Sequence, residues 1–96
     1  PAIVTADEIS DVSALRIETR VNGELRQNAE VSNMIFDVAD IIATISQYIT
    51  LHPGDIIATG TPAGVGAGQN PPQYLGNHDE VTISVEEIGT LRNYFI

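Results

Sequence analysis

A four-residue segment, Thr59-Gly60-Thr61-Pro62, has the residue types of a ligand-binding loop. Glycine has no Cβ, so a ligand can approach the backbone N–H groups beside Gly60. Pro62 fixes its own φ and restrains Thr61 to an extended conformation, which holds the Thr61 hydroxyl before a ligand arrives. Hydroxyls together with exposed N–H groups suit a carboxylate or a developing oxyanion. A tight turn without a ligand uses the same residue types, so the segment alone leaves both interpretations open.

The other residue types that could carry chemistry do not form a second candidate site. Cysteine is absent, which excludes disulfides, thiolate metal sites and a cysteine nucleophile. Lysine is also absent, which excludes the Gly-Lys-Ser/Thr phosphate loop. His52 and His78 have no acid at metal-ligand spacing, and Asp55 belongs to a Pro-Gly-Asp turn. We therefore assign these three residues turn or surface roles, predict no metal ligand in this chain and name no catalytic residue.

Composition and charge restrict the partners. The chain has 96 residues, of which 43% are hydrophobic and 18% charged, so it is predicted to be globular. Thirteen acids against four arginines give a net charge of −9, which disfavours nucleic acids and anionic membranes. No apolar run reaches the ~18–20 residues of a membrane span, and the start lacks the basic region of a signal peptide. We expect a cytoplasmic protein that binds neither nucleic acid nor membrane.

The first expected element is a β-hairpin. Residues 15–21 alternate between apolar and polar side chains, which is typical of a half-buried strand. Asn22-Gly23 follows, and this pair is a strong hairpin signal because both turn positions need a positive φ. The side chains predicted to be buried are Leu15, Ile17 and Val21, whereas Arg16, Glu18 and Arg20 are predicted to be more exposed.

A helix and further strands are expected after the hairpin. Apolar residues at helical spacing form a stripe from Val38 to Ile49, with Asp37 as the N-cap, and we expect this stripe to pack on the sheet. The helix should end near Ile49 or Thr50, before a type II turn that has Pro53 and Gly54 at its centre. Strands are predicted at residues 56–59, 81–86 and 90–96. The fold class is therefore α+β, mainly antiparallel or mixed β with one helix.

Several stretches, in order, resemble the fumarylacetoacetate hydrolase family. They are residues 21–27 (VNGELRQ), residues 34–36 (MIF) with the helix that follows, residues 51–66 (LHPGDIIATGTPAGVG), residues 72–75 (PQYL), Asp79, and residues 89–93 (GTLRN). The resemblance implies that residues 1–96 are the C-terminal part of one catalytic domain with a mixed β-sandwich or roll fold. It also implies that the metal-binding N-terminal part of that domain lies outside this sequence.

The resemblance implies an enzyme that acts on small keto-acids or dioates, usually as a homodimer. Such enzymes use Mg²⁺, Mn²⁺ or Ca²⁺, held by a Glu-x-Glu motif and an Asp in the N-terminal half, so this chain is expected to ligate none of them. Glu86-Glu87 has the wrong spacing for that motif. The reaction could be that of a hydroxyhepta-diene-dioate isomerase, a fumarylpyruvate hydrolase or a ureidoglycolate lyase. A threonine of the Thr-Gly-Thr stretch contacts substrate in the family, which implies substrate binding by Thr61, with Thr59 and Gly60 as neighbours.

Two departures and one alternative remain. The family usually has glycine where this chain has His78 and Glu87, which puts those two turns in question. Gln27 and Arg26 resemble the family's hairpin ending, and we expect Arg26 to be a solvated residue at the strand edge. The alternative function is a catalytically inert β-rich module that acts only through association. A Glu-x-Glu segment encoded upstream would favour the enzyme.

Overall fold

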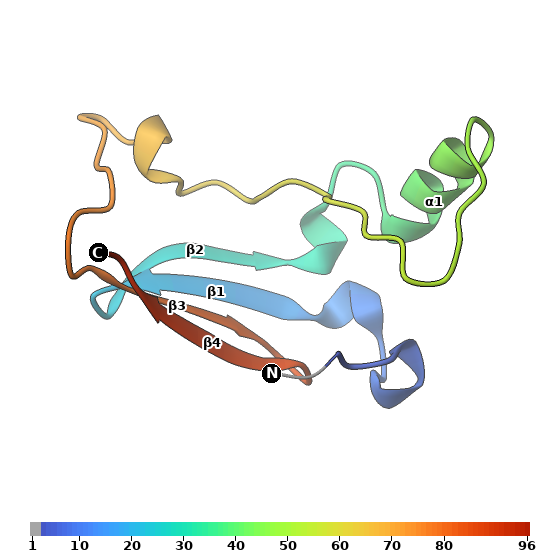
Figure 1. Cartoon of the computed structure of the whole chain (residues 1–96), viewed down its shortest axis with the longest axis horizontal. Helices are drawn as coiled ribbons and strands as arrows, with labels where there is room; N and C mark the ends of the chain where they lie inside the picture. Colours follow the sequence, from blue (N-terminus) through green and yellow to red (C-terminus); the bar gives the residue numbers. More distant parts are fainter. Residues whose placement is uncertain (1–2) are drawn as a thin grey trace.

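The computed structural model describes residues 3–96 as a four-stranded sheet with one α-helix (Figure 1). The strands are β1 (Arg16–Val21), β2 (Glu24–Glu30), β3 (Glu80–Val85) and β4 (Gly89–Tyr94), and the helix is α1 (Val38–Ser46). Four short 3-10 turns complete the list: η1 (Ala6–Glu8), η2 (Val12–Ala14), η3 (Val31–Asn33) and η4 (Gly66–Gly68). Every strand pair is antiparallel, and the strand order is β2-β1-β3-β4. The expected α+β class with antiparallel pairing and one helix is confirmed.

The β-hairpin forms where the sequence predicts it. Asn22 and Gly23 have φ values of 51° and 83°, so both turn residues are left-handed, as the Asn-Gly pair requires. Val21 pairs with Glu24 across the turn. The register shifts next to Thr19, so β2 carries one extra residue, Arg26, at a β-bulge.

The alternation along β1 separates an apolar face of the sheet from a polar one. Residues directly opposite each other in an antiparallel ladder share a face. Ile17 lies opposite Val85, and Thr19 lies opposite Ile83 and Gln27. The predicted register is therefore correct. Burial is lower than expected: among residues 3–96 only Leu15, 5% exposed, is a buried hydrophobic residue. Ile17 and Val21 are half-buried, as are Arg16 and Glu18 on the other face.

Helix α1 begins as predicted and ends earlier than predicted. Asp37 is the N-cap, and its carboxylate accepts a hydrogen bond of 2.7 Å from the Asp40 N–H. The helix ends at Ser46 rather than near Ile49, because the last turn tightens: the Gln47 and Tyr48 N–H groups bond to carbonyl oxygens three residues back.

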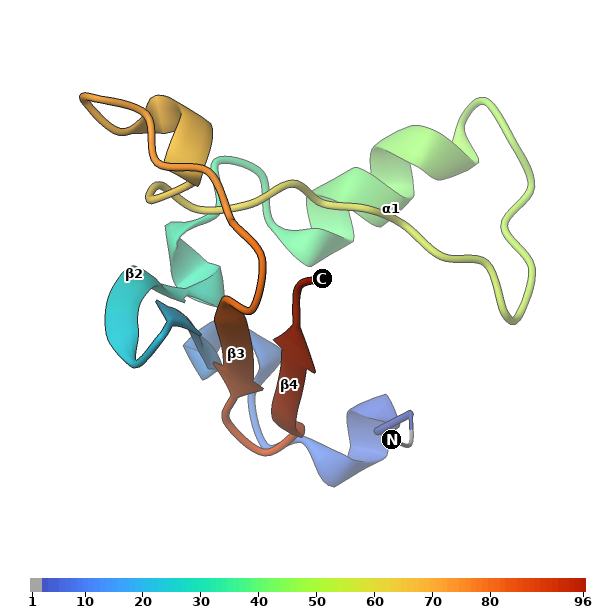
Figure 2. The same ribbon diagram turned by 60° about the vertical axis from the view of Figure 1, so that its left-hand side comes forward.

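The predicted packing of α1 on the sheet is wrong. The chain leaves β2 through η3 and an irregular segment that carries α1 beyond the end of the sheet (Figures 1 and 2). Within the described residues α1 packs substantially against no strand, and Ile42 of its apolar stripe is 44% exposed. The radius of gyration is 15.4 Å, against about 12.5 Å for a compact domain of this length. The apolar faces of α1 and of the sheet are thus left open.

The segment before the glycine loop is not a strand, which corrects the prediction for residues 56–59. It runs without ladder pairing, and Ile56 is 94% exposed. An apolar run of four residues forms a strand only when another strand lies beside it, and here the run has no ladder partner, although the Gln27 side chain of β2 reaches Thr61 just after it. Strands β3 and β4 are where the sequence places them, although β4 ends at Tyr94 rather than Ile96.

Both turns that depart from the family pattern keep a left-handed backbone. His78 has φ 70° and Glu87 has φ 60°, values at which a side chain is strained. The Glu87 carboxylate accepts a 2.8 Å hydrogen bond from the Ser10 hydroxyl, which ties the N-terminal segment to this turn. Both turns therefore have backbone conformations that favour glycine, and this chain adopts them with His78 and Glu87.

We expect His78→Gly to stabilise the protein by about 0.5–1 kcal/mol. The substitution removes left-handed strain of about 1–2 kcal/mol, and the added freedom of the unfolded chain offsets part of it. Glu87→Gly is the matched comparison, and it should gain less because it also removes the hydrogen bond to Ser10. Urea unfolding of the intact protein measures both. An equal gain in the two variants would show that the Ser10 contact contributes nothing.

Asp79 fastens the hairpin turn to the start of β3. Its carboxylate accepts hydrogen bonds of 2.7 Å from the Gly76 N–H and 2.8 Å from the Asn22 side chain. The Asn22 side chain in turn accepts from the Glu80 N–H at 2.9 Å. The Gly76 and Asn22 bonds, followed by the charge of Arg26, hold the pKa of Asp79 below its usual value of 3.8.

This lowered pKa predicts an acid-dependent contribution to stability. A carboxylate whose pKa is lower in the folded state stabilises that state fully above the unfolded pKa, and the contribution disappears as pH falls through the folded pKa. We therefore expect Asp79→Asn to lower the free energy of unfolding at pH 7 and to lower it by less at pH 3, which is below the unfolded pKa of the carboxyl. Urea unfolding at the two pH values tests this. A deficit that stays constant with pH would contradict a role for the ionised carboxylate.

Candidate substrate-binding groove

The predicted site segment lies against strand β2. The Gln27 side-chain nitrogen is 2.7 Å from the Thr61 hydroxyl oxygen and 2.9 Å from the Pro62 carbonyl oxygen. Gln27 and Thr61 are 34 residues apart in the sequence, so this contact is formed by the tertiary fold. In Figure 1 the segment containing Thr61 runs above β2.

Glycines allow the loop to lie this close to the strand. A Cβ on Gly64 would be 1.8 Å from the Arg26 carbonyl oxygen, and Gly64 has a φ of 111°. A Cβ on Gly66 would be 1.9 Å from the Gln73 carbonyl oxygen. Gly60 has φ 89° with open space where a Cβ would be, so its requirement is conformational. The loop thus lies directly against the backbone of β2 at Gly64 and folds back on its own backbone at Gly66.

The loop lines one side of a groove of about 560 Å³. Thr59, Gly60 and Thr61 all lie in its wall, so the structure gathers the three predicted substrate-binding residues around one space. The rest of the lining is largely apolar and includes Leu15, Ile17, Ala29, Val31, Met34, Phe36, Ile41, Val85 and Ile88. An apolar cavity with a few polar groups at one side is typical of small-molecule sites. Thr59 is exposed in this wall, not turned into a core.

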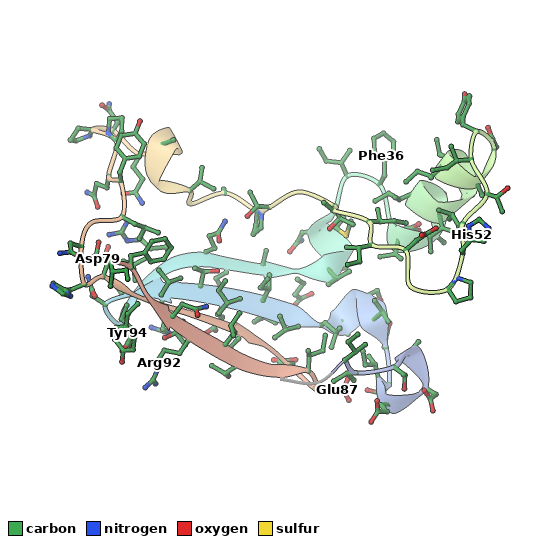
Figure 3. All side chains as sticks on the ribbon, viewed as in Figure 1. Phe36, His52, Asp79, Glu87, Arg92 and Tyr94 are labelled. Carbon is green, nitrogen blue, oxygen red and sulfur yellow. The ribbon has the colours of Figure 1, made fainter. Side chains whose placement is uncertain are left out.

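The turn before the site segment has the structure that its sequence predicts. Gly54 has φ 94°, and the Asp55 N–H donates to the His52 carbonyl at 3.1 Å, which are features of a type II turn. The Asp55 carboxylate accepts from the His52 N–H at 2.7 Å and stabilises that turn. His52 lies beside α1, whereas Asp79 lies at the opposite end of the sheet (Figure 3). These candidates therefore do not share one site.

Arg26 is not the solvated residue that the sequence suggests. Its side chain is only 17% exposed, and its Nε lies 3.3 Å from a Glu24 carboxylate oxygen. Arg26 is the extra residue of the β-bulge, which turns its side chain away from the simple alternation of the strand. Its charge contributes, after the Gly76 and Asn22 hydrogen bonds, to the lowered pKa of Asp79.

The described residues do not fit a divalent metal. Mg²⁺ and Mn²⁺ prefer several oxygen ligands arranged together. Across residues 3–96, no group of three or more His, Asp or Glu side chains comes together in such an arrangement. The acid in the groove wall, Glu30, already has partners, because it pairs with Arg16 at 2.6 Å and accepts a hydrogen bond from Ser32 at 3.1 Å.

Within residues 3–96, each helix is too short or too polar to cross a membrane.

Sequence reasoning missed the role of Gln27. The glutamine stands in the hairpin strand, and no local pattern links it to the Thr-Gly-Thr loop. The available signal was indirect, since Gln27 occupies the end of the hairpin motif that resembles the family. Only the tertiary contact between loop and strand shows that its amide reaches Thr61.

Known proteins with the same fold match the chain closely. A fumarylacetoacetate hydrolase from Exiguobacterium antarcticum is 49% identical, with a TM-score of 0.90 over 96% of this chain and 33% of its own. The 2-hydroxyhepta-2,4-diene-1,7-dioate isomerase of Mycobacterium marinum is 46% identical, with a TM-score of 0.80 over 98% of this chain and 33% of its own. The maleylpyruvate hydrolase of Sphingobium sp. SYK-6, in complex with manganese(II) and pyruvate, is 38% identical, with a TM-score of 0.86 over 98% of this chain and 33% of its own.

The chain also spans 31% of the length of its curated relatives from Staphylococcus species. Residues 1–96 match the model described as "Fumarylacetoacetate (FAA) hydrolase C-terminal" over their whole length. The relatives thus include both hydrolases and isomerases, one of them with a bound metal ion. This chain belongs to the fumarylacetoacetate hydrolase family.

Proposed function

We propose that residues 1–96 are the C-terminal part of one catalytic domain and that they supply the substrate-binding loop Thr59-Gly60-Thr61-Pro62. The domain would be a divalent-metal-dependent hydrolase, isomerase or lyase that acts on small keto-acids or dioates. One observation carries the proposal: a hydroxyl held by Gln27 lies in the wall of a groove, in a chain whose relatives are hydrolases and isomerases. Thr61 is assigned as the substrate contact, with Thr59 and Gly60 beside it.

The metal would be held by residues outside this chain. The donor set of residues 3–96 does not fit a hard cation, whereas a maleylpyruvate hydrolase of the same fold contains manganese(II) with pyruvate. We assign Mg²⁺ or Mn²⁺, with Ca²⁺ as a further candidate. The open apolar faces of α1 and the sheet suit a domain that continues as a mixed β-sandwich or roll. The intact enzyme is proposed to be a cytoplasmic homodimer.

Metal removal tests this proposal. The intact protein should turn over an acylpyruvate or 2-hydroxyhepta-2,4-diene-1,7-dioate when it is loaded with Mn²⁺ or Mg²⁺. Chelation should lower kcat by about 100-fold or more, since a metal-stabilised transition state loses several kcal/mol, and re-addition should restore it. Substrate loss and product formation, followed by absorbance and mass spectrometry, separate hydrolysis from isomerisation. Equal turnover before and after chelation would contradict a metal-dependent enzyme.

A second candidate function is an inert module that acts through association. The observation in its favour is that the described residues bury little apolar surface, with Phe36 67% exposed and the stripe of α1 uncovered. An intact protein that binds neither Mn²⁺ nor a keto-acid would favour this candidate. An intact protein that binds both the metal and the keto-acid but shows no turnover would not favour this candidate.

A further inference from the structure

Gln27 of β2 holds the loop hydroxyl in a defined direction. Its side-chain nitrogen contacts both the Thr61 hydroxyl oxygen and the Pro62 carbonyl oxygen. A carbonyl oxygen can only accept a hydrogen bond, so the NH₂ end of the amide must face the loop. One N–H then donates to the Pro62 carbonyl oxygen and the other to the Thr61 hydroxyl oxygen. These two bonds fix the amide orientation and make Thr61 an acceptor toward Gln27.

The hydrogen of the Thr61 hydroxyl is therefore left for another partner. An amide nitrogen cannot accept, so the Thr61 O–H bond cannot point at Gln27. Thr61 lies in the wall of the groove, so its hydroxyl is placed to donate a hydrogen bond to a ligand in the groove. A hydroxyl that accepts one hydrogen bond is also a stronger donor in the next, because hydrogen bonds in a chain polarise one another. The natural partner is an oxygen that carries negative charge.

We propose that Gln27 is a positioning residue that sets the direction of the Thr61 O–H bond toward a carboxylate or keto oxygen of the substrate. This inference rests on the proposed function and assigns a residue to it. Strand β2 is a suitable support, because Gln27 is half-buried in the ladder opposite Thr19. The carbonyl oxygen of Arg26, the residue before Gln27, lies directly against Gly64. The same strand therefore holds both the loop and the Gln27 side-chain amide. The hydroxyl direction is thus set by the sheet rather than by the loop.

A double-mutant cycle on the intact, Mn²⁺-loaded protein tests the proposal. Gln27→Met keeps the length of the side chain and removes the amide, and we expect affinity for pyruvate and kcat/KM to fall by about ten-fold. In a Thr61→Val background, the same substitution should change both quantities by less than about two-fold, since its target is gone. Gln27→Asn keeps the amide chemistry but shortens the reach by one methylene, and it should resemble Gln27→Met.

Gln73→Met is the matched control, because Gln73 is an exposed glutamine whose backbone, not its side chain, meets the loop. It should leave pyruvate affinity and kcat/KM unchanged. Melting temperatures confirm folding of each variant, and calorimetry supplies an affinity that does not depend on turnover. Losses of equal size in the wild-type and Thr61→Val backgrounds would overturn the positioning role, as would no loss in Gln27→Met. If the wild-type protein neither binds pyruvate nor turns over a keto-acid, the proposed function fails and this inference fails with it.

Discussion

Gly64→Ala should destabilise the intact protein by about 2–6 kcal/mol and should lower kcat/KM by about a hundred-fold. The new Cβ would lie 1.8 Å from the Arg26 carbonyl oxygen, so the loop or the strand must move. A backbone shift of this kind costs about 1–3 kcal/mol, and a side chain at φ 111° adds strain of about 1–3 kcal/mol. Thr61 is three residues away, and a displacement near 1 Å is enough to reduce activity by about two orders of magnitude.

Variants at three other glycines of the same loop separate the steric clash from the backbone strain as causes of the lost stability. Gly60→Ala introduces left-handed strain without a clash, Gly66→Ala introduces a clash without a positive φ, and Gly68→Ala introduces neither. We expect losses of about 1–2 kcal/mol for Gly60→Ala and about 1–3 kcal/mol for Gly66→Ala, and little change for Gly68→Ala. Urea unfolding gives the free energies. A Gly64→Ala variant as stable as Gly68→Ala would show that the loop does not lie against β2 in this way.

Thr61→Val should lower kcat/KM by about ten- to a hundred-fold. Valine keeps the shape and the β-branched rotamer preference but removes the hydroxyl. The loss of a hydrogen bond to a charged oxygen costs about 1.5–3 kcal/mol in the transition state. Stability should change by less than about 1 kcal/mol, because the Gln27 amide keeps its bond to Pro62 and water can reach the exposed site.

Two variants control this measurement. Thr61→Ser keeps a hydroxyl at the same position and should retain most of the activity. Thr59→Val removes the other hydroxyl in the groove wall, and it should have a smaller effect because Gln27 bonds to Thr61. A large loss in Thr59→Val with full activity in Thr61→Val would move the substrate contact to Thr59. Full activity in both would leave the segment as a tight turn with no part in binding.

The sequence by itself determined the elements whose causes are local. Asn22-Gly23 needs a left-handed pair at the hairpin turn, and the structure has one there. Asp37 caps a helix where the period of the apolar residues changes from two to that of a helix. The type II turn at Pro53-Gly54 likewise follows from the φ preferences of two adjacent residues. The stretches that resemble the fumarylacetoacetate hydrolase family are likewise contiguous in the sequence.

Only the tertiary structure decided where those elements lie relative to one another. The apolar stripe of α1 predicted burial, but a stripe does not specify which surface covers it, and within the described residues it is left open. Residues 56–59 have the composition of a strand and lack a neighbouring strand to pair with. The contact between Gln27 and Thr61 joins residues 34 positions apart. No periodicity records such a contact, because it depends on how closely glycines let two backbones approach.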